Sequence, residues 1–197
     1  MAQDTNGVKD AGPWIAAANP TYTVLIDEKH VVSKLYNMVN VPTGVWIDEH
    51  GKIVRPNEVA FVDDRFKNFT GLDSAPYLNA LRDWVEKGSR SAYVMNETRL
   101  RETLAVNDPD VLLAAAEFGL AENLYKSGHL AEAIPHFKEA QRLNPKSWNY
   151  KRQAYALSNA QRDYGTTFNE EVQKAGGSKV YYSHPDLSPS PPKDQKP

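Results

Sequence analysis

The segment from Asn40 to Arg55 constrains the fold more than any other part of the sequence. It reads NVPTGVWIDEHGKIVR. The residues from Thr43 to Asp48 form a continuous apolar run, which is typical of strands covered on both faces. Asp48 to Gly51 suits a hairpin loop in which Gly51 supplies a positive φ, and the next three residues begin a returning strand. The segment therefore predicts a turn at Pro42, a buried strand, a tight hairpin and a second strand.

The residues before this segment predict two helices and a strand. Ala11 to Asn19 has its apolar residues on one helical face, and the following Pro20 ends the helix. Thr21 to Asp27 is rich in β-branched and aromatic residues and predicts a strand. A second amphipathic helix is expected within residues 28–39. Its predicted buried face consists of Val31, Val32, Leu35, Tyr36 and Val39.

The residues after the segment predict an irregular stretch and then a helix. Pro56 to Asp73 has no clear period, with a short strand expected at Val59 to Val62. The helix is expected to be capped by Asp73 or Ser74 and to stop at Gly88. Its predicted buried stripe consists of Tyr77, Leu78, Leu81, Trp84 and Val85. This order of strands and helices predicts an α/β layer architecture.

Composition limits the chemistry that this chain can carry. It has 197 residues, 41% of them apolar, and no cysteine. The absence of cysteine excludes disulfides, thiolate metal sites and cysteine catalysis within the chain. The net charge of −2 gives no sign of a nucleic-acid partner, and no apolar run reaches the roughly 18 residues of a membrane helix. We expect no cofactor, no membrane segment and, since the first ten residues do not resemble a signal peptide, a cytoplasmic location by default.

Residues 1–88 resemble the thioredoxin-like superfamily, specifically its thiol–disulfide oxidoreductase and alkyl hydroperoxide reductase/thiol-specific antioxidant group. The most specific match is the stretch LYNMVNVPTGVWIDEHGKIV, which starts at Leu35. The resemblance implies a partial thioredoxin-like fold, with a mixed sheet and flanking helices. It also implies a cis peptide bond before Pro42 and a substrate-facing loop in which Val41 offers backbone groups to a partner and Thr43 flanks them.

The chain departs from this family in one respect that decides its chemistry. In the family, a strand and a cysteine-bearing helix come before the point that corresponds to Met1. That strand would lie between the equivalents of Met1–Asp4 and Gly44–Asp48, and its absence leaves unpaired backbone groups. We therefore interpret the chain as the later part of a longer protein, with a shortened and rearranged relative as the alternative.

Two functions remain open at this point. The resemblance implies a thiol–disulfide oxidoreductase or peroxidase role for the full-length protein, in which this chain is inactive by itself. The alternative is a non-catalytic interaction module. It would use the Pro42 loop and the helical second half to hold an extended peptide or a partner helix.

The second half of the chain predicts helices. A linker with one short charged helix is expected at residues 89–109, a helical module at 110–162, and an extended, disordered tail at 163–197. Residues 114–147 resemble a tetratricopeptide repeat, whose period is about 34 residues. The residues expected to pack this all-α hairpin are Leu120, Ala121, Leu124, Gly128, Ala133, Phe137, Ala140 and Pro145. A third helix is expected at residues 148–160, with Ala154 and Leu157 facing inward.

Other polar residues suggest no catalytic or metal site. The acidic pairs that start at Asp27, Asp48 and Asp63 are interpreted as solvated turn and cap residues. His129 and His136 lack a third ligand, so no metal site is expected. The remaining side chains that we considered are His30 and His50, predicted to lie on the surface, and Trp46 and Trp84, predicted to lie in the core.

Overall fold

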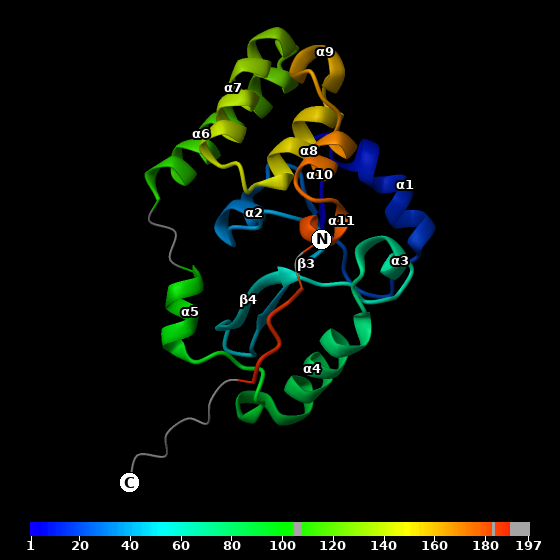
Figure 1. Ribbon diagram of the computed structural model, residues 1–197, viewed down its shortest axis with the longest axis vertical. Helices are drawn as coiled ribbons and strands as arrows, with labels where there is room; N and C mark the ends of the chain where they lie inside the picture. The colour runs from blue at the N-terminus through cyan, green and yellow to red at the C-terminus, as the bar shows by residue number, and fades with distance from the viewer. Residues whose placement is uncertain (105–107, 183, 190–197) are drawn as a thin grey trace. The chain divides into compact units, whose positions relative to one another are not determined.

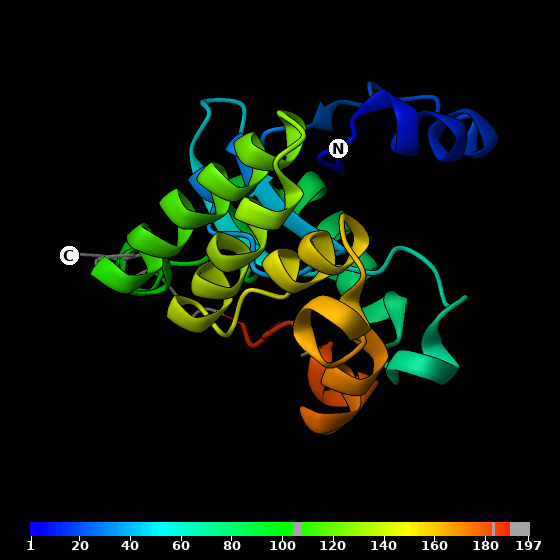
Figure 2. The same ribbon diagram turned by 90° about the horizontal axis from the view of Figure 1, so that it is seen from above.

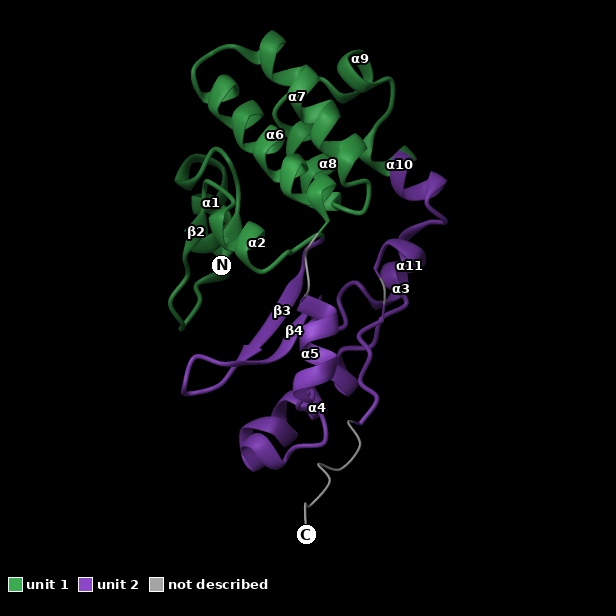
Figure 3. Cartoon of the chain, turned by 90° about the vertical axis from the view of Figure 1, so that its left-hand side faces the viewer, with its two compact units in different colours: residues 1–39, 106–170 green, residues 40–105, 171–197 purple. Residues whose placement is uncertain are grey.

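The computed structural model describes residues 1–104, 108–182 and 184–189. The chain forms two compact units, coloured separately in Figure 3: unit 1 comprises residues 1–39 and 106–170, and unit 2 comprises residues 40–105 and 171–197. This grouping differs from the expected domains, because the first 39 residues belong with the helical module. The physical reason is a buried polar contact between Thr5 and Glu122.

Unit 1 begins with a small parallel α/β element. Strand β1 (Ala2–Gln3) pairs with β2 (Ile26–Asp27), and helix α1 (Val8–Ala18) connects them. The predicted helix at residues 11–19 is thus confirmed with an earlier start. The predicted strand at residues 21–27 is wrong except for its last two residues.

Helix α2 (Val31–Leu35) is shorter than predicted, and the buried face expected for it is wrong. The side chain of Leu35 is 77% exposed, whereas Ser33 and His30 are buried. The cause is the carboxylate of Asp27, which accepts hydrogen bonds from the backbone N–H groups of Val31 and Ser33. This cap fixes the helix with Ser33 facing inward.

The rest of unit 1 is helical. Helices α6 (Pro109–Lys126) and α7 (Leu130–Leu143) lie side by side in both Figure 1 and Figure 2, followed by α8 (Trp148–Ala156) and α9 (Ala160–Tyr164). The predicted third helix is confirmed but ends at Ala156 instead of residue 160; Ala154 within it and Leu157 just after it are buried as expected. The core shared by these helices is built from Ala114, Phe118, Ala121, Ala133, Phe137, Ala140, Leu143, Tyr150, Ala154 and Leu157.

Unit 2 is built around an antiparallel hairpin. Strand β3 (Thr43–Ile47) pairs with β4 (Ile53–Val59), and helix α4 (Ser74–Lys87) packs on them through Tyr77 and Ala80. The indoles of Trp46 and Trp84 stack with ring centroids 5.1 Å apart; Trp46 is buried in the core as predicted, and the partly buried Trp84 packs against it. The shorter helices are α3 (Lys67–Thr70), η1 (Gly88–Arg90), α5 (Glu97–Leu104) and α11 (Ser178–Tyr181), and α10 (Phe168–Lys174) spans the boundary between the units.

Several predictions for the α4 region hold and others fail. Gly51 has φ +75°, Asp73 caps α4, and Gly88 follows its last residue, as expected. The strand β3 is not covered on both faces, because only Trp46 is buried in it. The strand β4 extends through residues 56–58, which were expected to be irregular, and of the strand expected at Val59 to Val62 only Val59 belongs to it. Val85 is exposed.

The predicted linker and tail are ordered over much of their length. Met95 is buried and donates its backbone N–H to the carbonyl of Val54, which fastens the linker to the hairpin. Helix α10 begins within the predicted tail, and α11 buries Tyr181. Residues 105–107, 183 and 190–197 of the predicted linker and tail lie outside the described residues.

The fold class is mixed α/β, with more helix than strand. The described strands form two separate two-stranded sheets, one parallel and one antiparallel. Among the described helices, none combines the length and the hydrophobicity that crossing a membrane requires.

Candidate functional site

The predicted Pro42 loop lies at the start of the hairpin in unit 2. The Val41–Pro42 peptide bond is cis. The backbone N–H of Val41 donates to its neighbour's side chain, Asn40 Oδ1, at 2.8 Å, and the hydroxyl of Thr43 donates to the carbonyl of Glu58 at 3.0 Å. The carbonyl of Pro42 accepts from Ala60 at 3.3 Å. The donor that Val41 was expected to offer to a partner is therefore occupied by Asn40.

A buried arginine lies in the same hairpin, and sequence reasoning did not single it out. Arg55 is 1% exposed and makes a two-pronged ion pair with Glu58, at 2.7 and 2.9 Å. Its other donors bind the carbonyls of Tyr93, at 2.8 Å, and Asp186. The guanidinium also lies 5.4 Å from the ring centroid of Trp46. Since all three guanidinium nitrogens donate to groups within unit 2, we assign Arg55 a structural role.

Of the eight residues predicted to pack the repeat, five come together in unit 1, and the other three, Leu120, Gly128 and Pro145, are exposed. Ala121, Ala133, Phe137 and Ala140 are fully buried, and Leu124 packs against them. Gly128 lies in the turn between α6 and α7, and Pro145 lies in the exposed loop after α7. Leu120 was expected in the packing set, but it is 47% exposed. It precedes buried Ala121 by one residue, and neighbouring residues of a helix point to different faces.

Replacing Gly128 by alanine is expected to destabilise unit 1 by about 1–2 kcal/mol, because its φ is +86° and L-residues are strained there. The matched control is Gly119→Ala inside α6, where helix propensity favours alanine and the added Cβ meets only the mobile end of Lys34. Urea unfolding followed by circular dichroism measures both. Equal stabilities of the Gly128→Ala variant and the unmodified protein would contradict this role of Gly128.

A buried polar cluster joins the N-terminal residues of unit 1 to α6. It consists of Thr5, His30 and Glu122, each at most 5% exposed. The hydroxyl of Thr5 donates to Glu122 Oε1 at 2.7 Å. His30 Nε2 lies 3.4 Å from both Thr5 Oγ1 and Glu122 Oε1, while His30 Nδ1 has no hydrogen-bond partner among the described residues. The prediction that His30 lies on the surface is wrong.

Burial favours the uncharged forms of both Glu122 and His30, so it raises the pKa of the acid and lowers the pKa of the base. Burial raises the pKa of Glu122 from 4.5 to about 7, against the opposing hydrogen bond from Thr5. Burial lowers the pKa of His30 from 6.5 to about 4, and the ammonium groups of Lys34 and Lys126 add to this, whereas Asp27 opposes it. Near neutral pH the imidazole is therefore neutral, and Glu122 holds its proton over much of the range where a free carboxyl would be ionised.

The cluster does not have the geometry of a nucleophilic triad. In such a triad the imidazole contacts the hydroxyl with one nitrogen and the carboxylate with the other. Here both short contacts of His30 involve Nε2, and Thr5 is too deeply buried to meet a substrate. We assign the cluster a structural role in which the charge state of Glu122 affects how firmly residues 1–39 attach to α6.

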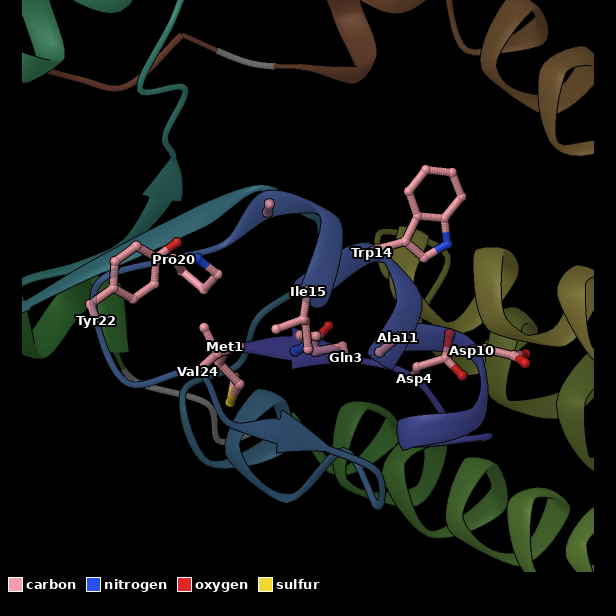
Figure 4. Close-up of a pocket in the computed structure, with 12 residues that line it drawn as sticks. Met1, Gln3, Asp4, Asp10, Ala11, Trp14, Ile15, Pro20, Tyr22 and Val24 are labelled. Carbon is pink, nitrogen blue, oxygen red and sulfur yellow. The ribbon is translucent and has the colours of Figure 1, made fainter.

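A hollow of about 450 Å³ lies beside β1 in unit 1 (Figure 4). Residues of β1, α1 and the following loop line it, and none of them was singled out from the sequence as a site residue. Its lining includes Asp4, Asp10, Trp14, Ile15, Tyr22 and Val24. Trp14 and Tyr22 are 79% and 72% exposed, so two large aromatic side chains stand in solvent here.

The other polar residues considered from the sequence have local partners. Asp48 accepts from two backbone N–H groups of the hairpin turn, as expected of a turn residue. Asp27 caps α2 but is buried, so its predicted solvation is wrong. His136 Nδ1 lies 2.6 Å from Glu117, and among the described residues no group of three or more histidine or acidic side chains is arranged to hold a metal ion.

No family model matches the chain, and neither the curated proteins nor the solved structures contain a significant match. The thioredoxin-like and tetratricopeptide resemblances thus receive no support from these comparisons and rest on the motifs quoted above.

Proposed function

We propose that this chain is a non-catalytic, protein-binding member of the thioredoxin-like superfamily, from its thiol–disulfide oxidoreductase and alkyl hydroperoxide reductase/thiol-specific antioxidant group. The order of elements supports this scaffold: a parallel β1–α1–β2 unit, then the Pro42 loop, a hairpin and a covering helix. The chain has no cysteine, and thiol–disulfide exchange requires a thiolate. Any thiol chemistry must therefore use cysteines from outside these residues, and this chain contributes binding.

An exposed apolar stripe on α6 is the main observation that supports the binding role. Leu112, Leu113, Ala116 and Leu120 are all exposed, and Ala116 lies three or four residues from each of the leucines. The opposite side of α6 is filled by Phe118 and Ala121 in the core. The helix therefore has one packed and one solvent-facing apolar side. A repeat of the tetratricopeptide type normally buries such a face against a neighbouring helix, so we propose that a partner's amphipathic helix docks on it.

The double variant Leu113→Asp/Leu120→Asp tests this role. Charges placed in the stripe are expected to reduce recovery of stripe-dependent partners at least tenfold in quantitative affinity purification. The control is Val85→Asp, which changes an even more exposed apolar residue on α4 and is expected to bind as the unmodified protein does. Circular dichroism must show that both variants fold. Equal recovery of every partner with the double variant would overturn the proposed use of α6.

The second part of the proposal concerns catalysis. Insulin reduction and peroxide consumption by the purified chain are expected to equal the buffer blank, because no residue in it can supply a thiolate. Turnover above the blank would overturn the non-catalytic assignment directly.

A further inference from the structure

We propose that the hollow beside β1 binds an extended peptide segment of another protein. In this arrangement the segment pairs with the open edge of β1, and a lysine or arginine flanked by apolar residues enters the hollow. This surface shares no residue with the α6 stripe, so the two proposals can be tested independently.

The backbone of β1 leaves one edge open. Ala2 donates its N–H to the carbonyl of Leu25 at 2.8 Å, in register with Ile26 of β2. Successive residues of a strand direct their N–H and C=O groups to opposite sides, so those of Gln3 point away from β2. No third strand of the described residues pairs with β1. An open strand edge is a ready template for another extended segment.

The hollow offers apolar contacts to the side chains of such a segment. Figure 4 shows Ile15 pointing toward Gln3 on the strand, and Tyr22 beside Pro20 at the far end. The hollow's volume of about 450 Å³ falls within the range of ligand sites and suits a few side chains. Exposing the aromatic rings of Trp14 and Tyr22 together is unfavourable in water, and contact with a bound segment would cover part of them.

The negative charge at one end of the hollow favours a basic residue in the bound segment. Among the described residues that line it, Asp4 and Asp10 are the only ones with acidic or basic side chains, and Figure 4 shows them next to each other. Asn6 holds both: its backbone N–H donates to Asp4 Oδ1 at 2.8 Å, and its side-chain amide donates to Asp10 Oδ2 at 2.7 Å. Neither carboxylate forms an ion pair with a described residue. The site therefore presents two positioned negative charges that a lysine or arginine would neutralise.

Fluorescence anisotropy with the full chain and three labelled peptides tests the proposal. The first peptide is Thr-Val-Lys-Val-Thr-Ile-Thr with blocked ends, the second has glutamate in place of lysine, and the third carries N-methyl groups on alternate residues. The lysine peptide is expected to bind at least tenfold more tightly than each of the other two. Absence of saturable binding overturns the proposal, and equal binding of the N-methylated peptide overturns strand addition.

The variant Asp4→Asn/Asp10→Asn tests the charge. Asparagine keeps an oxygen to accept the hydrogen bonds from Asn6, so the turn is expected to stay folded. The preference for lysine over glutamate is expected to fall below twofold. The control Glu132→Gln removes an exposed carboxylate on α7 of the same unit and is expected to keep the full preference. A tenfold preference that survives in the Asp4/Asp10 variant overturns the assigned role of these carboxylates.

Discussion

Replacing Glu122 by glutamine is expected to stabilise unit 1 at pH 8 and to leave its stability almost unchanged near pH 4.5. Glutamine resembles the protonated carboxyl in shape and still accepts the hydrogen bond from Thr5. It removes only the unfavourable ionisation of a buried group. A pKa moved from 4.5 to about 7 corresponds to about 3 kcal/mol once Glu122 is fully ionised. The gain at pH 8 is therefore expected to approach that value.

The direction of the pH dependence follows from proton binding. Between pH 4.5 and about 7 the folded protein keeps the Glu122 proton that the unfolded chain releases, so this group lowers the free energy of unfolding as the pH rises. His30 has the opposite effect between about pH 4 and 6.5, because its folded form binds the proton more weakly. The two contributions cancel between about pH 4.5 and 6.5. Stability is expected to decline above that range in the unmodified protein, but not in the glutamine variant.

Urea unfolding at several pH values, followed by hydrogen exchange of the α6 amides, measures this effect. The charged or titratable groups that act on the cluster, Asp27, Lys34, Lys126 and Tyr150, remain in place in the variant. Glu132→Gln, at an exposed position of α7, is the matched control and is expected to show no pH-dependent gain. A stability difference between Glu122→Gln and the unmodified protein that is constant from pH 4.5 to 8 would contradict the raised pKa.

The elements that the sequence predicts well are those fixed by neighbouring residues. The hairpin turn depends on Asp48 and Gly51, which lie three residues apart, and the start of α4 depends on the cap from Asp73. The α6–α7 pair depends on small residues at helical spacing within each helix, Ala114 and Ala121 in α6 and Ala133 and Ala140 in α7. In each case the atoms that determine the structure lie within one or two turns of chain.

The buried polar groups could not be predicted in this way, because their partners are distant in sequence. Thr5 and Glu122 are separated by 117 residues, and Arg55 and Asp186 by 131. A threonine, a histidine or an arginine with no visible partner is most simply interpreted as exposed. The error at α2 has a different cause, because its partner is near in sequence. There the buried carboxylate of Asp27 holds the helix with Ser33 facing inward, against the apolar pattern that favoured burial of Leu35.

Replacing Arg55 by methionine is expected to destabilise unit 2 by about 3–5 kcal/mol. Methionine fills much of the volume but leaves Glu58 as a nearly buried carboxylate without its cation, which is the main source of the loss. The carbonyls of Tyr93 and Asp186 also lose their donor. Both carbonyls belong to segments predicted to be linker and tail, so the variant is expected to loosen them from the hairpin.

A second substitution separates the charge from the packing. Adding Glu58→Gln to Arg55→Met is expected to recover part of the loss, because it removes the uncompensated carboxylate. Near-ultraviolet circular dichroism of the stacked Trp46 and Trp84 reports on unit 2 during urea unfolding. Arg65→Met, which breaks an exposed ion pair with Asp63, is the control and is expected to have little effect. If Arg55→Met lowered the stability of unit 2 no more than this control does, the assigned role of Arg55 in holding residues 93 and 186 to the hairpin would be wrong.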